Sequence, residues 1–196
     1  MKYQRAWAEI NLAHISHNLE AVKEITGNSE IMGIVKADGY GHGAVPVANT
    51  LLANGVRSLG VAICEEGVAL RENGIIAPIL IMGFTPEPLL PYVLENNLTQ
   101  TVFSADGAKI LALHAARLNK RAAVHIKIDT GMSRLGFMPE KKSIEAVCEI
   151  AENPSVYIEG IYTHFATSDA LESTFVDEQF KRFLWVLGEL KKKTKK

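Results

Sequence analysis

The chain has 196 residues, which is long enough for one domain with a substantial hydrophobic core. Its composition, 47% hydrophobic and 22% charged, is that of an ordinary soluble globular protein. The formal net charge is −1, so charge gives no argument for a nucleic-acid or membrane partner, although five lysines gather in residues 191–196.

The first 28 residues predict a short strand followed by a helix. Residues 6–10 alternate weakly between apolar and polar side chains, which indicates the strand. Asn11 is placed to cap the helix, and Gly27-Asn28 is placed to end it. One face of the helix carries an apolar stripe formed by Leu12, Ile15, Leu19 and Val22.

The next cycle contains the most unusual stretch of the chain. Residues 31–35 are apolar and read as a buried strand, which Lys36 closes. A loop with alternating glycines and one tyrosine, Tyr40, then leads to a helix from Ala44 to Leu52. Glycines permit positive φ and let a backbone approach a ligand closely. The glycines of this loop are Gly39, Gly41 and Gly43.

The same order of strand and helix repeats along the rest of the chain. Ser104 is placed to cap one of the later helices, whose side chains Ile110, Leu111, Leu113 and Leu118 are predicted to face inward. Alternation at 20–35 residues is typical of parallel βαβ units and of an α/β fold. The strands are expected at 59–63, 79–82, 101–103, 122–128 and 156–162, and the helices at 65–73, up to 95, after 104, 139–152 and 175–191.

Six such units fit either a doubly wound sheet or most of a (β/α)8 TIM-type barrel. Lys36, the loop 129–136 and His164 all follow directly on the ends of predicted strands. A barrel concentrates its chemistry at that edge, and a doubly wound sheet uses the same edge at its switch point. The pattern favours a barrel, of which this chain carries about six βα units, and leaves the doubly wound sheet open.

Lys36 has two interpretations when it is taken alone. It is either a charge that reaches solvent at the end of a strand, or a desolvated amine able to form an imine with an aldehyde. The sequence around it, Val-Lys-Ala-Asp-Gly-Tyr-Gly-His-Gly at 35–43, resembles the pyridoxal-phosphate segment of alanine racemases. The resemblance implies that Lys36 holds pyridoxal 5'-phosphate (PLP) as a Schiff base, and that Tyr40 contacts the cofactor phosphate.

A second segment, residues 125–137, joins a charged strand end to an arginine between glycines. Lys127 and Arg134 either form a surface ion pair with Asp129, or Arg134 presents a fixed guanidinium to an anionic oxygen. This segment also resembles alanine racemases. There the matching arginine approaches the cofactor's phenolic oxygen and the substrate carboxylate, and the lysine matching Lys127 carries a carbamate in some members. Carbamylation requires a neutral amine, so it requires a lowered Lys127 pKa.

The third segment, residues 160–169, contains His164. A histidine at a strand end is either a hydrogen-bonded loop residue or a titratable catalytic group. The resemblance to alanine racemases implies that His164 stacks on the pyridine ring, and that Asp169 lies near the substrate entrance. The other histidines have no metal-ligand partners in the sequence, and no motif supports a metal site.

The likeness to alanine racemases runs from about Arg5 to Leu190. It identifies residues 1–190 as a partial N-terminal PLP-binding barrel domain, followed by a lysine-rich tail at 191–196. Members of the family are about twice as long, and their C-terminal β-domain is expected to be absent here. That domain would supply, from the partner subunit of a homodimer, the tyrosine that acts as the second base. The chain is therefore expected to be a truncated racemase, inactive alone.

The function implied is PLP-dependent interconversion of L-alanine and D-alanine, which supplies D-alanine for the peptidoglycan of the cell wall. Two alternatives stay open. One is another racemase of this fold type, acting on serine or lysine, and the other is a non-catalytic PLP-binding barrel protein. The sequence does not choose between these side-chain specificities.

The cysteines and the N-terminus bear on the compartment. Cys64 and Cys148 lie far apart without metal-ligand spacing, so we expect small buried side chains in a reducing environment. No apolar run is long enough to cross a bilayer, and residues 1–5 do not lead into a signal-peptide core. A cytoplasmic protein is expected.

Overall fold

A computed structural model describes residues 6–170, 172 and 174–193 of the chain. The structure divides into two compact units, Met1–Gly83 (unit 1) and Phe84–Lys196 (unit 2), and each is described by itself. Of the predicted lysine-rich tail, residues 194–196 lie outside the described residues.

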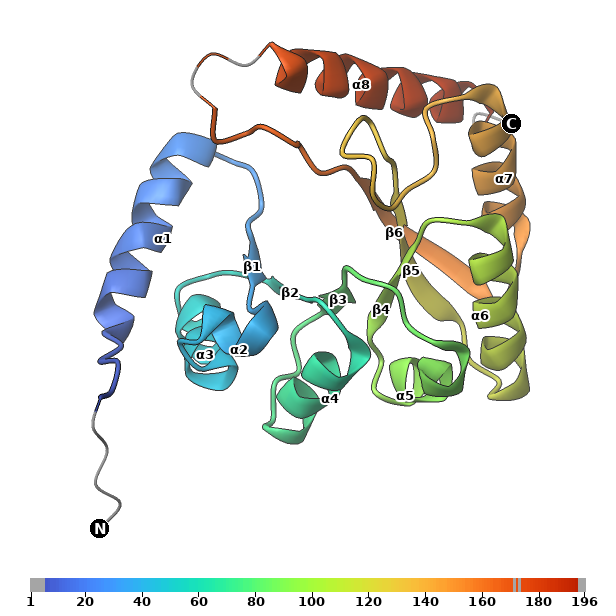
Figure 1. The fold of residues 1–196 in the computed structure, drawn as a ribbon. Coiled ribbons are helices and arrows are strands. Elements are labelled where there is room, and N and C mark those ends of the chain that lie inside the picture. Colours follow the sequence, from blue (N-terminus) through green and yellow to red (C-terminus); the bar gives the residue numbers. More distant parts are fainter. Residues whose placement is uncertain (1–5, 171, 173, 194–196) are drawn as a thin grey trace. The chain divides into compact units, whose positions relative to one another are not determined.

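Unit 1 is built on three short strands that pair in parallel and in chain order (Figure 1). Gly33, Leu59 and Ile79 stand in register across the three strands. All three residues are buried, and so is the rest of β3, whereas Met32, Ile34 and Ser58 are only partly buried. The middle of the strands therefore forms the centre of the unit. The elements are β1 (Met32–Ile34), β2 (Ser58–Val61), β3 (Ile79–Ile81), α1 (Leu12–Thr26), α2 (Lys36–Tyr40), α3 (Ala44–Ala53) and α4 (Cys64–Glu72).

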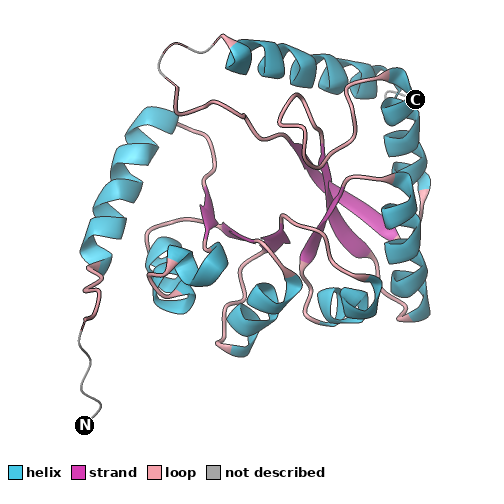
Figure 2. Cartoon of the chain, in the orientation of Figure 1, coloured by secondary structure: helices cyan, strands magenta, loops and turns pink. Residues whose placement is uncertain are grey.

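Unit 2 repeats the same alternation of parallel strands and helices (Figure 2). The register aligns Lys127 with Tyr162, and a bulge between Val124 and His125 places Glu159 out of the ladder. The elements are β4 (Thr99–Val102), β5 (Ala122–Lys127), β6 (Val156–Tyr162), the 3-10 turn η1 (Glu87–Leu89), α5 (Leu90–Glu95), α6 (Ala105–Arg117), α7 (Lys141–Glu152) and α8 (Phe175–Lys193).

The two faces of β5 have different environments, as the sequence predicts. Val124, Ile126 and Ile128 point into the hydrophobic core formed with the helices, whose members include Leu111 and Val186. Successive strand residues point to opposite faces, so His125 and Lys127 lie on the face away from that core. Of the predicted site residues of unit 2, Lys127 lies on this polar face, and Arg134 and His164 lie in the loops that follow β5 and β6.

Parallel strands alternating with helices confirm the predicted α/β class, and most element bounds agree within two residues. The caps predicted at Asn11 and Ser104 are also confirmed, since Asn11 accepts from Ala13 N and Ser104 from Gly107 N. The strand predicted at 6–10 is wrong: those residues join no sheet, and Trp7 is 71% exposed. Weak alternation without a pairing partner does not make a strand.

The inward face predicted for α6 is also largely wrong. Leu111 is buried, but Leu113 is 59% exposed, and Ile110 and Leu118 lie at the surface. The helix instead buries three alanines, Ala108, Ala112 and Ala115. Small side chains allow close packing of helices, so the larger residues occupy the outer face.

Not one helix in the described part of the chain is long and apolar enough to span a bilayer.

Candidate active site

The residues that follow β1 form a single turn of left-handed helix. Lys36 lies two residues after the end of β1, and the φ angles of the next four residues are all positive: 50° at Ala37, 53° at Asp38, 63° at Gly39 and 55° at Tyr40. Such a conformation costs roughly 1–2 kcal/mol for each residue that is not glycine. Consecutive strained residues persist only where their surroundings fix them, and they occur mainly at functional sites.

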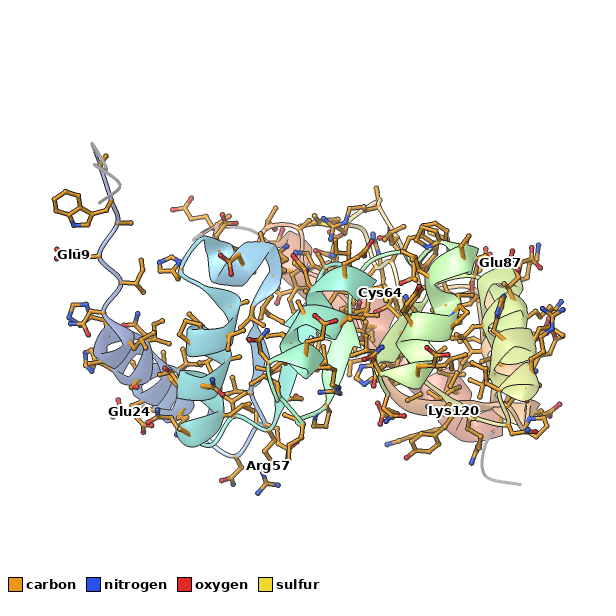
Figure 3. The ribbon with its side chains drawn as sticks, turned by 90° about the horizontal axis from the view of Figure 1, so that it is seen from below. Glu9, Glu24, Arg57, Cys64, Glu87 and Lys120 are labelled. Atoms are coloured by element: carbon orange, nitrogen blue, oxygen red, sulfur yellow. The ribbon has the colours of Figure 1, made fainter. Side chains whose placement is uncertain are left out.

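A carboxylate from the next βα connection holds this turn. Glu66 lies on the first turn of α4, two residues after Cys64, which Figure 3 labels. Its Oε1 accepts a hydrogen bond from Ala37 N at 2.6 Å, and its Oε2 accepts from Ala62 N at 2.7 Å and from Ile63 N at 3.3 Å. One side chain therefore ties the loop after β1 to the loop after β2.

The polypeptide closes the turn from within as well. Asp38 Oδ1 accepts from Ala44 N at 2.7 Å, which joins the turn to the start of α3. His42 Nδ1 lies 3.0 Å from the carbonyl oxygens of Gly39 and Tyr40. His42, to which the sequence assigned no role, is therefore part of the framework of the loop.

The turn fixes the directions of the two side chains that the sequence singled out in unit 1. The Lys36 side chain is half-buried, and its Nζ lies 5.7 Å from the centroid of the Tyr40 ring. The Tyr40 side chain is 60% exposed. The structure thus brings Lys36 and Tyr40 together at the carboxyl end of β1.

We expect that replacing Glu66 by alanine lowers the free energy of unfolding by about 2 kcal/mol, because it leaves the N–H groups of Ala37 and Ala62 without their acceptor. Replacing the exposed neighbour Glu65 by alanine should change it by less than about 1 kcal/mol. Equilibrium unfolding in urea measures both values. Equal losses in the two variants would contradict this role of Glu66.

In unit 2, the loop after β5 is organised around another carboxylate. Asp129 is buried, and its Oδ1 accepts from Gly131 N and Ser133 N, both at 3.0 Å, while Oδ2 accepts from Arg134 N at 2.8 Å. Burial acts to raise the pKa of Asp129, but these backbone hydrogen bonds and Lys127 outweigh it and hold the pKa below its usual value. The carboxylate is therefore charged and fixes the backbone that presents Arg134.

The surface ion pair considered for this segment is not what the structure contains. Within the described residues, no ion pair joins Asp129 to Lys127 or to the Arg134 guanidinium. The Asp129 carboxylate binds the backbone of the loop instead, and the Arg134 side chain is exposed. This leaves the guanidinium available to an anionic group.

Lys127 is a buried lysine on the polar face of β5. It is 6% exposed, its Nζ donates to Ile128 O at 3.0 Å, and it lies 5.4 Å from the centroid of the Tyr162 ring. Burial lowers the Lys127 pKa; the charge of Asp129 opposes this effect, and that of Arg134 adds to it. Tyr162 is held by Thr101 Oγ1 at 3.0 Å, and burial raises the pKa of its hydroxyl.

The lowered Lys127 pKa gives a pH-dependent prediction. The folded chain releases this proton at a lower pH than the unfolded chain, so the stability of the wild type rises with pH between the two pKa values. Lys127→Met should therefore be about 1 kcal/mol more stable than the wild type at neutral pH, and the gain should shrink toward pH 10. Urea unfolding at several pH values measures this, with exposed Lys181→Met as the control. A gain that does not change with pH would contradict it.

His164 follows β6, and its backbone is held by a side chain of α8. The side chain is exposed, whereas the His164 carbonyl accepts from Gln179 Nε2 at 3.1 Å. Thr163, the residue before it, donates from Oγ1 to Ile128 O at 2.9 Å. Asp169 is exposed and lies in a turn after β6, outside any helix or strand.

The structure thus gathers the predicted residues in two groups. Lys36 and Tyr40 lie together in unit 1, and Lys127, Arg134 and His164 lie at the carboxyl ends of β5 and β6 in unit 2. Sequence reasoning missed the side chains that hold these groups, because their partners are distant in the chain and no spacing identifies them. These are Glu66, Thr101, Thr130, Tyr162, Thr163 and Gln179.

Together these features define the class of protein as an α/β barrel with its polar site residues at the carboxyl ends of strands. Strands alternate with helices, and a lysine, an arginine and a histidine stand at the carboxyl ends of strands, which is where (β/α)8 barrels carry their chemistry. The profile of the family "Alanine racemase, N-terminal domain" matches residues 10–196. The chain belongs to this family, whose domain is a TIM barrel, and its described residues carry six βα units of that fold.

Individual relatives agree with this assignment. An alanine racemase of Clostridium tetani is 43% identical over 187 residues, which are 95% of this chain and 48% of the relative. The structure of alanine racemase from Clostridium difficile 630 superposes with a TM-score of 0.94 at 38% identity, covering 97% of this chain and 50% of that one. A histidine racemase of Leuconostoc mesenteroides gives a TM-score of 0.83 at 29% identity, covering 88% and 46%. The chain spans about half the length of the relatives it matches.

Proposed function

We propose that this chain is the PLP-binding part of a racemase that interconverts L-alanine and D-alanine. The observation that carries the proposal is the placement of Lys36, a half-buried primary amine at the carboxyl end of β1, beside the exposed hydroxyl-bearing ring of Tyr40. Sequence similarity to alanine racemases over almost the whole chain supports the choice of alanine.

The residues present fit the chemical groups of PLP. An aldehyde requires a primary amine, which Lys36 offers, and a phosphate requires hydrogen-bond donors, of which the Tyr40 hydroxyl is one. In unit 2 the exposed Arg134 guanidinium can donate to a phenolic oxygen or to a carboxylate, and the exposed His164 ring can stack on a pyridine ring. Lys36 would hold the cofactor covalently. When it is bound, PLP supplies an electron sink that makes the substrate α-proton acidic.

The chain's own residues then have distinct tasks. The Lys36 amine would take or return the α-proton on one face of the substrate. Arg134 stays charged, so it orients anionic oxygens and does not transfer the proton. Lys127 has the lowered pKa that carbamylation needs, and a carbamate there would orient Arg134. Asp169, in an exposed segment, is assigned to the entrance for substrate.

We extend the proposal to the whole protein of which this chain is a part. Residues 1–190 act as the N-terminal barrel domain, and the intact racemase works in the cytoplasm as a homodimer that supplies D-alanine to peptidoglycan. Serine and lysine remain alternative substrates, and the structural likeness to a histidine racemase adds histidine as a further candidate. A PLP-binding barrel without catalysis is the alternative of another class. Comparing amino acids as substrates of the intact racemase separates these cases.

The first experiment asks whether Lys36 reacts with PLP. The chain is mixed with increasing PLP, reduced with borohydride and digested, and the modified lysine is identified by peptide mass spectrometry. Saturable labelling concentrated on Lys36 is expected. Labelling spread over exposed amines such as Lys191–Lys193 would show that no cofactor site is formed, and the proposal would then fail for this chain.

A further inference from the structure

A glutamine of α8 is buried completely between the two loops of the unit 2 site. Gln179 is 0% exposed. Its Oε1 accepts from Ala166 N at 2.9 Å, and its Nε2 donates to His164 O and to Thr130 Oγ1, both at 3.1 Å. Both amide hydrogens and the carbonyl oxygen are used, so the amide has only one orientation in which all its partners are satisfied.

The hydrogen bonds that continue from Gln179 also have one direction. Thr163 Oγ1 gives its single hydrogen to Ile128 O at 2.9 Å. In the 2.8 Å contact between Thr130 Oγ1 and Thr163 Oγ1, Thr130 must therefore be the donor, and its oxygen is left to accept from Gln179. The chain of donors runs from Gln179 through Thr130 and Thr163 to Ile128 O, and that oxygen also accepts from Lys127 Nζ at 3.0 Å.

This chain ties together the backbones on which the candidate site residues stand. Thr130 and Ile128 flank Asp129, whose carboxylate holds the loop of Arg134. Thr163 directly precedes His164. A second contact from α8, Arg182 Nη1 to Thr130 O at 2.8 Å, reinforces the attachment.

Stability alone does not explain a glutamine at this position. α8 already packs on the core through Phe183, Val186 and Leu190. Burying a polar side chain costs free energy unless every hydrogen bond is made, and an apolar side chain of similar size is often neutral or stabilising in its place. What the amide adds is a fixed geometry of two loops relative to each other.

From these contacts we infer that Gln179 is a positioning residue: through the hydrogen-bond chain Gln179–Thr130–Thr163 it fixes the His164 backbone against the loop that carries Arg134. Its relevance to catalysis rests on the proposed function, because His164 and Arg134 are assigned there to cofactor and substrate. The positioning itself concerns only residues of this chain, so it can be tested without PLP.

The test compares variants of matched size in the full chain. Gln179→Met removes every hydrogen bond of the side chain and keeps its length. Gln179→Glu keeps an acceptor for Ala166 N but, as a carboxylate, cannot donate to Thr130 or His164. Thr163→Val breaks the donor chain, and Thr163→Ser, which keeps the hydroxyl, is its matched control.

Two readouts need no cofactor. In Gln179→Met, hydrogen exchange of the Ala166 amide should accelerate about tenfold or more, while amides in the middle of β5 keep the wild-type rate. The His164 imidazole NMR signals should broaden or split in Gln179→Met, Gln179→Glu and Thr163→Val and stay single in Thr163→Ser. In Gln179→Glu they should sharpen again when the pH falls far enough to protonate the new carboxyl group, because it can then donate.

A third readout uses PLP. When the variants are loaded with PLP, the circular dichroism of the cofactor band should be weaker in Gln179→Met and Thr163→Val than in the wild type, while borohydride trapping at Lys36 continues. Wild-type exchange at Ala166 and unchanged His164 signals in Gln179→Met would overturn the inference. Acceleration of all unit 2 amides by the same factor would also overturn it, since the residue would then act only on stability. Failure of PLP to label the wild type would refute the proposed function and leave the two cofactor-free readouts as the test of positioning.

Discussion

Replacing Gly136 by alanine is expected to lower the free energy of unfolding by roughly 3–5 kcal/mol. The φ angle of Gly136 is +145°, a region that L side chains rarely adopt. An added Cβ would also meet the backbone of the facing segment: Asp129 N, Ile128 C at 2.7 Å and Asp129 Cα at 2.9 Å. Backbone cannot move aside as a flexible side chain can, so the loop around the Asp129 carboxylate would have to open.

Two other glycines of unit 2 are controls for this prediction. At Gly188, in the middle of α8, an added Cβ meets nothing within 4 Å, so Gly188→Ala should stabilise the chain by about 0.5–1 kcal/mol. At Gly131 the Cβ would meet only side chains, Phe175 Cζ at 2.6 Å and Arg182 Nη1 at 3.1 Å, so an intermediate loss is expected. Equilibrium unfolding in urea ranks the three variants. A Gly136→Ala chain as stable as wild type would show that this loop geometry is wrong.

Features carried by local sequence were predictable. Apolar runs bounded by turn residues gave the strands, and the caps at Asn11 and Ser104 gave the starts of two helices. The assignment of Lys127 to the face of β5 opposite Val124 and Ile126 followed from alternation alone. Local periodicity determines these features, and a single sequence contains it.

Features that depend on distant partners were not predictable. Ala37 and Asp38 adopt left-handed angles that their own residue types disfavour, and Glu66, 28 residues beyond Asp38, accepts the hydrogen bond that helps to fix the turn. Gln179 looks like a polar residue of an amphipathic helix, yet it is fully buried. The prediction for residues 6–10 failed for the opposite reason: their sequence is strand-like, but no strand pairs with them.

In both units, a carboxylate that accepts hydrogen bonds from backbone N–H groups holds a loop after a strand. Glu66 accepts three backbone N–H groups and holds the turn after Lys36, and Asp129 accepts three and holds the loop of Arg134. In the described part of the chain, neither carboxylate forms an ion pair with the cation whose loop it holds. A carboxylate paired with the amine or the guanidinium would compete with the anionic groups of a ligand. Binding the backbone instead positions each cation and leaves its charge for the ligand.

Under the proposed role of Lys36, Lys36→Arg should lose borohydride-trapped PLP by about tenfold or more, because a guanidinium keeps the charge but stays protonated and does not form the covalent link. The free energy of unfolding should change by less than about 0.5 kcal/mol, since the side chain is only half-buried. Lys191→Arg, at the exposed end of α8, is the matched control and should trap PLP as the wild type does.

Comparing the wild type with Lys36→Arg and Lys191→Arg separates electrostatic attraction of PLP from its covalent attachment. If electrostatic attraction of the phosphate were enough, Lys36→Arg would retain PLP reversibly and protect the other lysines from labelling to the same extent as wild type. If the left-handed turn positions a reactive amine, only the wild type and Lys191→Arg should show saturable trapping at one lysine. Equal trapping in all three chains would mean that the strained backbone of residues 37–40 serves the fold of unit 1 and not the attachment of a cofactor.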